Sequence, residues 1–169
     1  MTHRSLTPAE WDLWHSWMEA QHIVVTDVDR SLQAEAGISK AEFSILRTLG
    51  SAPDAPLRVG DLGAALRWEK SRVSHLLTRM ENRDLVERIE DGAPGRRTAV
   101  TPSANGLKVL EAALSVHERS VARLFFDRVT SEQLVAIRAW SEQTTHASPD
   151  ESDDDPTTEV ADYSPRRQT

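Results

Sequence analysis

The chain contains, near its centre, the stretch Trp68-Glu-Lys-Ser-Arg-Val-Ser-His-Leu-Leu-Thr-Arg-Met-Glu81, in which apolar residues recur with helical spacing. On a helical wheel of about 100° per residue, the apolar side carries Val73, Leu76, Leu77 and Met80. The other side carries hydroxyl groups, a histidine and arginines, with no acid between Lys70 and Met80. An ordinary amphipathic surface helix divides in the same way. The composition of this polar side, however, suits base edges and phosphate oxygens.

The segments around this helix predict a winged helix-turn-helix. A brief helix over about 60–66 and a turn at Arg67-Trp68 precede it, and two helices joined by so tight a turn form a helix-turn-helix. Beyond it, the extended runs 86–90 and 96–101 flank the turn-rich segment Asp91-Gly-Ala-Pro-Gly95, which predicts a β-hairpin. A β-hairpin that directly follows a helix-turn-helix is a wing.

Capping signals predict longer helices outside this region. Three capping boxes mark helix starts: Thr7 with Glu10, Ser39 with Glu42, and Thr130 with Gln133. The first of these helices ends near Gly37 and carries an apolar seam of near-heptad spacing: Trp11, Trp14, Met18, Val25, Val28 and Leu32. Ser103 caps another helix, whose apolar stripe consists of Leu107, Leu110, Leu114, Val121, Leu124 and Phe125.

The predicted fold class is mainly α: four helices, two strands and two helices in chain order, with a short strand also allowed at 57–59. The predicted regions are an N-terminal dimerisation helix (1–36), a winged helix-turn-helix DNA-binding region (37–103), C-terminal dimerisation helices (104–146) and a disordered acidic tail (147–169). The tail is nearly devoid of apolar residues and cannot offset its ordering entropy by burial. The two apolar stripes would leave a monomer with a large exposed apolar surface, which predicts a homodimer.

Composition restricts the remaining classes of function. The 169 residues include no cysteine, which excludes disulfides, thiolate metal sites and cysteine nucleophiles. Since the sequence shows no signal peptide and no apolar run of membrane-spanning length, we expect a soluble, cytoplasmic protein. The net charge of −7 argues against nucleic acid, but residues 147–169 contribute −5 of it, whereas residues 67–79 carry +3. Binding of nucleic acid depends on a local basic face, so the composition allows it.

We predict that the helix over about 69–83 enters the major groove of double-stranded DNA, and that the wing, 86–102, contacts the backbone or the minor groove. The helix N-terminus favours phosphate through its amide groups and its dipole. The candidate DNA-binding residues are Lys70, Ser71, Arg72, Ser74, His75, Thr78 and Arg79 on the helix, and Arg96 and Arg97 on the wing. Alternatively, the two wing arginines are solvated loop charges; their place after a helix-turn-helix favours a role in binding.

The same residues carry a resemblance to a known family. The runs Arg58-Val-Gly-Asp-Leu-Gly-Ala-Ala-Leu66, Trp68–Glu81 and Leu85-Val-Glu-Arg88 resemble the MarR (multiple antibiotic resistance regulator) family of transcription factors. The resemblance covers residues from about 8 to 145, and 68–81 is its most specific part. It implies a homodimer paired through the terminal helices, with a winged helix in each subunit. The family's reading face is matched by Ser71, Arg72, Ser74, His75 and Thr78, and its wing arginine by Arg96.

Three positions depart from the family pattern. The family usually has an Asp two residues before the wing arginine, where this chain has Pro94, so an ion pair at the root of the wing would need Asp91 instead. Asp84 stands where the family usually has Gly before Leu-Val, and we therefore expect the helix to end differently. The segment Val100-Thr-Pro-Ser-Ala-Asn-Gly106 takes the place of the family's Leu-Thr-Pro-x-Gly.

Aromatic residues on the first helix allow two interpretations. Members of the family bind small aromatic molecules between their dimerisation and DNA-binding parts, which makes Trp11, Trp14, His15 and Met18 candidate residues of an effector pocket. The alternative, which we favour, is packing of the tryptophans at a dimer interface. We expect no metal and no cofactor: His15, Glu19 and His22 share a helical face, but such spacing arises by chance.

These observations predict a sequence-specific transcriptional regulator and no enzyme, since no phosphate-binding loop, nucleophile elbow or zinc-protease motif is present. The family implies a ligand-responsive repressor that binds a pseudo-palindromic operator as a homodimer. The alternative function is a winged-helix module that recognises protein without specific DNA binding. The acidic tail is interpreted as a solubilising extension or, alternatively, as a competitor of DNA for the basic wing.

Overall fold

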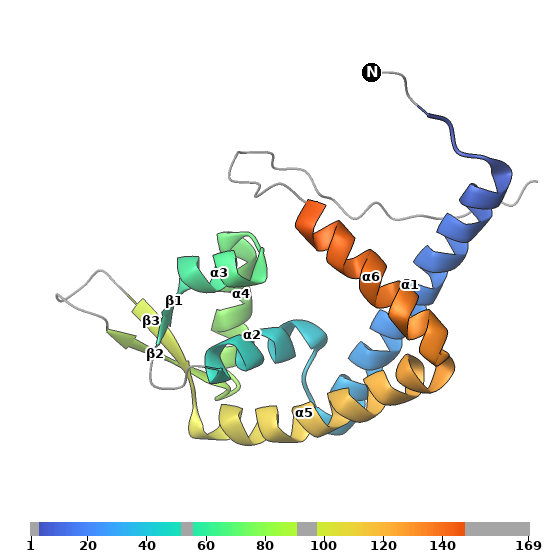
Figure 1. The fold of residues 1–169 in the computed structure, drawn as a ribbon. Helices are drawn as coiled ribbons and strands as arrows, with labels where there is room; N and C mark the ends of the chain where they lie inside the picture. The colour runs from blue at the N-terminus through green and yellow to red at the C-terminus, as the bar shows by residue number, and fades with distance from the viewer. Residues whose placement is uncertain (1–3, 52–55, 91–97, 148–169) are drawn as a thin grey trace, which may run out of the picture. The chain divides into compact units, whose positions relative to one another are not determined.

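The structure is a computed structural model that describes residues 4–51, 56–90 and 98–147 (Figure 1). It confirms the predicted fold class, mainly helical with a small antiparallel sheet. The elements are α1 (Pro8–Ala36), α2 (Lys40–Gly50), β1 (Leu57–Arg58), α3 (Val59–Leu66), α4 (Lys70–Glu81), β2 (Val86–Glu90), β3 (Thr98–Pro102), α5 (Ala104–Leu124), the 3₁₀ helix η1 (Phe126–Arg128) and α6 (Ser131–Ala147). They belong to two compact units, one ending at Arg128 and one beginning at Val129.

The predicted capping boxes are present at the first two helices. At α1 the Thr7 hydroxyl accepts a hydrogen bond from the Glu10 amide, and the Glu10 carboxylate accepts one from the Thr7 amide. This backbone hydrogen bond is the main reason why the pKa of the Glu10 carboxyl lies below its usual value. Ser39 and Glu42 form the same reciprocal pair at α2. Between them, Gly37 ends α1 with a φ of 69°, a left-handed conformation that glycine adopts without strain.

The three strands form one antiparallel sheet in the order β1-β3-β2. Its β2–β3 pairing, from Val86 opposite Pro102 to Glu90 opposite Thr98, is the predicted hairpin of the wing. β1 pairs with the other edge of β3 and has only two residues, because Val59 already begins α3. The wing is thus anchored on both sides of β3.

The core of the first unit lies where the helices and the sheet meet. α2 packs against α3, α5 and β3, while α5 packs along α1 (Figure 1). Fully buried side chains of this core include Leu32, Ile38, Ile45, Leu46, Leu62, Leu77, Met80, Val86 and Val100, and α5 adds the buried Leu110, Val116 and Leu124. The helix-turn-helix and the wing therefore share one core with the long helix α5.

α5 turns only part of its apolar stripe to this core. Leu110 and Leu124 are buried as expected, but Leu107 and Leu114 are exposed. The buried face instead includes small residues at intervals of seven: Gly106, Ala113 and Ser120. Small side chains let a helix approach its neighbours closely, so they face the core although they add little apolar surface. The exposed part of the stripe agrees with the surface expected for dimerisation, which stays a prediction.

The apolar seam of α1 is divided between two environments. Val28 and Leu32 are buried in the region where α1 packs along α5. Every residue from Trp11 to Ile23 is exposed. The end of α1 therefore belongs to the core of its own chain, whereas its first half presents large apolar side chains to the surface.

α6 is the described part of the second unit and begins at the predicted cap. The Gln133 amide donates to the Thr130 hydroxyl, and the Thr130 amide donates to the Gln133 side chain. Ala147, which the sequence assigns to the tail, is still helical, and residues 148–169 lie outside the described residues. Among the described residues, no helix combines the length and apolarity that crossing a bilayer requires.

Candidate nucleic-acid interface

α3 and α4 are joined by the tight turn that the sequence predicts. Arg67 ends α3 in the left-handed region, with a φ of 53°, and the Trp68 amide donates to the Gly63 carbonyl oxygen at 2.9 Å. A Cβ at Gly63 would lie 3.0 Å from the carbonyl oxygen of Trp68. Glycine therefore gives the turn the room it needs, and α4 starts directly beside the end of α3.

The two sides of α4 are buried and exposed as the helical wheel predicts. Val73, Leu77 and Met80 are fully buried, and Leu76 is nearly so. The polar side consists of exposed residues and one half-buried serine (Ser74): Lys70, Ser71, Arg72, His75, Thr78 and Arg79. The structure thus gathers these predicted residues on one side of a helix whose other side is fixed in the core.

The first turn of α4 has no side-chain cap. Glu69 is the N-cap residue, and its side chain makes no cap hydrogen bond, in contrast to Thr7, Ser39 and Ser103 at α1, α2 and α5. No acidic residue lies in the first turn. Uncapped amide groups and the positive end of the helix dipole suit a phosphate, so this end of α4 can accept the DNA backbone.

Two residues that the sequence did not indicate contact the polar side of α4. The ring of Trp68 lies beneath the guanidinium group of Arg72, with 4.5 Å from the guanidinium carbon to the ring centroid. Arg88 of β2 donates from Nη2 to the Thr78 hydroxyl at 3.4 Å and from Nε to Glu81 at 3.0 Å. The four-residue spacing of Trp68 and Arg72 is a signal that could have revealed the first contact. Nothing local in the sequence connects Arg88 to α4.

The tip of the wing falls outside the described residues. β2 packs against α4, which brings the root of the wing to the side of this helix. Arg96 and Arg97 belong to the segment 91–97, as does the departure from the family at Pro94. Their contacts with DNA, and an ion pair of Asp91, stay predictions.

Asp84 occupies the place of the family's glycine and adopts a conformation that glycine favours, with a φ of 53°. α4 ends at Glu81, and the Leu85 amide bonds back to the Met80 carbonyl oxygen at 2.9 Å. The Asp84 carbonyl oxygen then accepts a hydrogen bond from the Ser103 hydroxyl at 2.5 Å. The chain therefore leaves α4 through Asp84 in a left-handed conformation, which costs an aspartate more free energy than a glycine.

The candidate effector residues Trp11, Trp14, His15 and Met18 lie on the exposed half of α1. The rings of Trp11 and His15 stack, with 5.7 Å between their centroids. Helical spacing alone accounts for this proximity, and it does not separate an effector pocket from a dimer interface. Within the described ranges, no three His, Asp or Glu side chains are arranged to hold a metal ion.

Comparisons with known proteins agree with this geometry. A family model described as MarR family matches residues 36–97. The transcriptional regulator HosA of Escherichia coli O127:H6 is 34% identical over 96 residues, which are 57% of this chain and 69% of that regulator. AbsC, a MarR family transcriptional regulator from Streptomyces coelicolor, has a TM-score of 0.74 at 29% identity, over 85% of this chain and 97% of that chain. Sco3205, a MarR family regulator from the same organism in complex with DNA, has a TM-score of 0.79 at 28% identity, over 90% and 97%.

Proposed function

Because this chain belongs to the MarR family of transcriptional regulators, we propose that it is a homodimeric repressor that binds a pseudo-palindromic operator and releases it when a ligand binds. The observation that carries the proposal is the exposed polar side of α4, backed by the buried Val73, Leu77 and Met80. A helix held in this way can enter a groove of DNA while the core fixes its position. The DNA complex of the similar regulator Sco3205 supports this use of the fold.

In this proposal α4 lies in the major groove. Arg72 and His75 read base edges, helped by the hydroxyl groups of Ser71, Ser74 and Thr78. Two cations near the ends of the polar side, Lys70 and Arg79, contact phosphates and fix the register of the helix on the duplex. The wing contacts the backbone or the minor groove through Arg96 and Arg97.

The exposed half of α1 supports the homodimer. Trp11, Trp14 and Met18 are 47%, 49% and 44% exposed in the single chain, and large apolar side chains gathered on a surface are typical of a protein interface. We assign α1, α5 and α6 to dimerisation. Twofold symmetry would then place two copies of α4 about 34 Å apart, in successive major grooves.

The same helix supports a response to a small aromatic molecule. The rings of Trp11, Trp14 and His15 offer stacking surfaces near the proposed dimer interface. A ligand that binds one arrangement of the two subunits better than the other shifts the population between DNA-bound and free states. The ligand therefore needs no contact with α4 to release the operator.

Selection of bound duplexes from a random pool tests the proposed function. The expected result is a palindromic consensus whose affinity falls steeply with salt and falls again when one of a panel of small aromatic compounds is added. Arg72→Ala combined with His75→Ala serves as the control, because it should not enrich the same consensus. Binding that ignores both duplex sequence and salt would contradict the proposal and favour a winged-helix module that recognises protein.

A further inference from the structure

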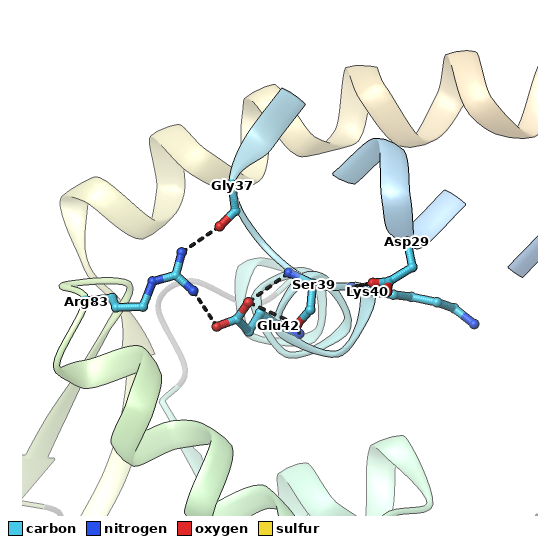
Figure 2. A network of polar contacts seen from close by, with 6 residues as sticks. All are labelled: Asp29, Gly37, Ser39, Lys40, Glu42 and Arg83. Atoms are coloured by element: carbon cyan, nitrogen blue, oxygen red, sulfur yellow. Dashed lines mark hydrogen bonds and ion pairs between the residues drawn. The ribbon is translucent and has the colours of Figure 1, made fainter. Parts of the chain in front are cut away.

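Arg83, two residues beyond the end of α4, reaches from the reading helix to the junction of α1 and α2 (Figure 2). Its Nη1 donates to Oε1 of Glu42 at 2.7 Å, and its Nη2 donates to the carbonyl oxygen of Gly37 at 2.6 Å. These partners lie 41 and 46 positions away in the sequence. One guanidinium group thus connects the exit of α4 with the end of α1 and the start of α2.

Glu42 uses both of its carboxylate oxygens at this junction. While Oε1 accepts the hydrogen bond from Arg83, Oε2 accepts bonds from the Ser39 amide at 2.8 Å and the Ser39 hydroxyl at 3.0 Å. Glu42 is only 8% exposed, whereas the side chain of Arg83 is 47% exposed, so water reaches the guanidinium group but little of the carboxylate. On the other side of the junction, Asp29 of α1 accepts a hydrogen bond from the Lys40 amide at 2.6 Å (Figure 2). The three helices are therefore joined by directed polar contacts.

These contacts differ in kind from the apolar packing of α4. Apolar contacts are non-directional and tolerate small rotations of one helix against another, whereas two charge-assisted hydrogen bonds from one planar group fix both distance and direction. Gly37 is also the C-cap of α1, where the helix dipole favours a cation. By contrast, the side chains of the Arg119–Glu35 ion pair are 62% and 52% exposed. Exposed ion pairs of this kind contribute little to stability.

We propose that Arg83 is a positioning residue for operator recognition, which holds α4 in a fixed orientation to α1 and so sets the half-site spacing that the dimer accepts. The inference rests on the proposed function, in which α1 pairs the subunits and α4 reads DNA. If α4 can move relative to α1 in each subunit, the distance between the two copies of α4 in the dimer varies as well. Removing the Arg83 contacts therefore relaxes the spacing without removing any DNA contact.

The test measures binding of the full chain to operator duplexes whose central spacer is shortened or lengthened by one or two base pairs. Each added pair moves a half-site by about 3.4 Å and rotates it by about 35°. When the spacer changes by one base pair, the wild-type protein is expected to lose affinity about tenfold. Arg83→Gln is expected to lose less than about threefold at the same step and to bind an isolated half-site as wild type does.

Two further variants separate this role from stability in general. Glu42→Gln keeps an acceptor for the α2 cap but removes the charge that Arg83 binds, and should relax the spacing as Arg83→Gln does. Arg119→Gln removes the exposed pair with Glu35 and should keep the wild-type spacing dependence. Spacing discrimination by Arg83→Gln as sharp as that of wild type would overturn the inference.

A second measurement requires no operator and so separates this inference from the proposed function. Because the chain has no cysteine, spin labels can be attached selectively at Gln21→Cys on α1 and Arg79→Cys on α4, both exposed positions. Excess unlabelled chain limits each dimer to one labelled subunit. Arg83→Gln is expected to broaden the distance distribution between the labels, and an unchanged distribution would overturn the positioning role even where no operator had been found.

Discussion

The guanidinium group of Arg72 lies over the ring of Trp68, with 4.5 Å between the guanidinium carbon and the ring centroid. Trp68 is half-buried against the core, whereas Arg72 is exposed on the polar side of α4. The ring therefore provides a fixed platform beneath a long and otherwise mobile side chain. An arginine held in advance loses less conformational freedom when it binds a base.

Replacing this platform should weaken operator binding through Arg72. Trp68→Leu keeps an apolar side chain but removes the ring, and should weaken binding about two- to fivefold, the value of an exposed cation–π contact. Trp68→Phe keeps a ring and should lose less. Fluorescence anisotropy with the selected operator measures both effects. An equal loss for Trp68→Leu in an Arg72→Gln background would show that the ring acts by another route.

Substitutions in α4 and in the wing should weaken operator binding in different ways. Arg72→Ala or His75→Ala should cost about 1–3 kcal/mol and relax the preference at one base pair. Arg96→Ala with Arg97→Ala should weaken all sequences alike and reduce the salt slope by about two. Binding of base-substituted operators at several salt concentrations distinguishes the two patterns. The division of roles is incorrect if both sets of variants lose affinity without any change in base preference.

His117 should make the fold less stable in mild acid. Its ring stacks on Phe43, with centroids 4.9 Å apart. Burial, followed by the nearby Arg47 and Lys40, lowers the pKa of His117 below its usual value, and Glu118 opposes this only in part. The unfolded chain therefore binds more protons, so the unfolding free energy falls as the pH drops below about 6.5.

His117→Phe separates this titration from the other groups that respond to acid. The variant keeps a stacked ring but cannot take up a proton, so it should lose less stability than wild type between pH 7 and pH 5. Urea unfolding across this range measures the difference. Parallel curves for the two proteins would rule out the histidine as the source.

Gly106 should not accept even a methyl group. A Cβ there would lie 1.9 Å from the carbonyl oxygen of Leu85, a backbone atom that cannot swing aside. Gly106→Ala is expected to cost about 3 kcal/mol or more, the upper range for overpacking. Gly60→Ala is the matched control, because nothing lies within 4 Å of a Cβ at that position; it should stabilise the fold by about 0.4–1 kcal/mol. Equal midpoints in urea would contradict this account of α5 packing.

Replacing Asp84 by the glycine that the family usually has there should make the fold more stable. Its φ of 53° strains an L residue with a side chain. Its hydrogen bonds to Ser103 and Asn105 use the backbone carbonyl oxygen and survive the change. Asp84→Gly is expected to raise the unfolding free energy by up to about 1 kcal/mol, while the β-branched Asp84→Val should lower it. Thermal unfolding ranks the stability of wild type and the two variants. A glycine variant less stable than wild type would show that the conformation of Asp84 is not strained.

Much of the fold could be predicted because its signals are local. Thr7 and Glu10 lie within one helical turn, so their reciprocal capping needs no other part of the molecule. The division of α4 into a buried and an exposed side likewise follows from a period of 3.6 residues. The polar side of α4 around Arg72 and His75 was therefore visible in the sequence, and the structure leaves it exposed.

The contacts that other segments make with this side of α4 were not visible in the sequence, because they depend on how those segments pack against the helix. Arg88 reaches Thr78 from a strand, and its role depends on how β2 packs beside α4. The face of α5 that packs into the core of its own chain was not visible either. Burial there follows close approach at small residues such as Gly106 and Ala113, and hydrophobicity alone does not register such contacts.

The order of amino acids was enough to specify where helices start, which side of α4 is polar and that a wing follows, since each depends on neighbours within a few positions. The pairing of Arg83 with Glu42 and Gly37 joins residues more than 40 positions apart. Such a contact exists only once whole helices have packed, because their separation and angle determine which distant groups come within hydrogen-bonding distance.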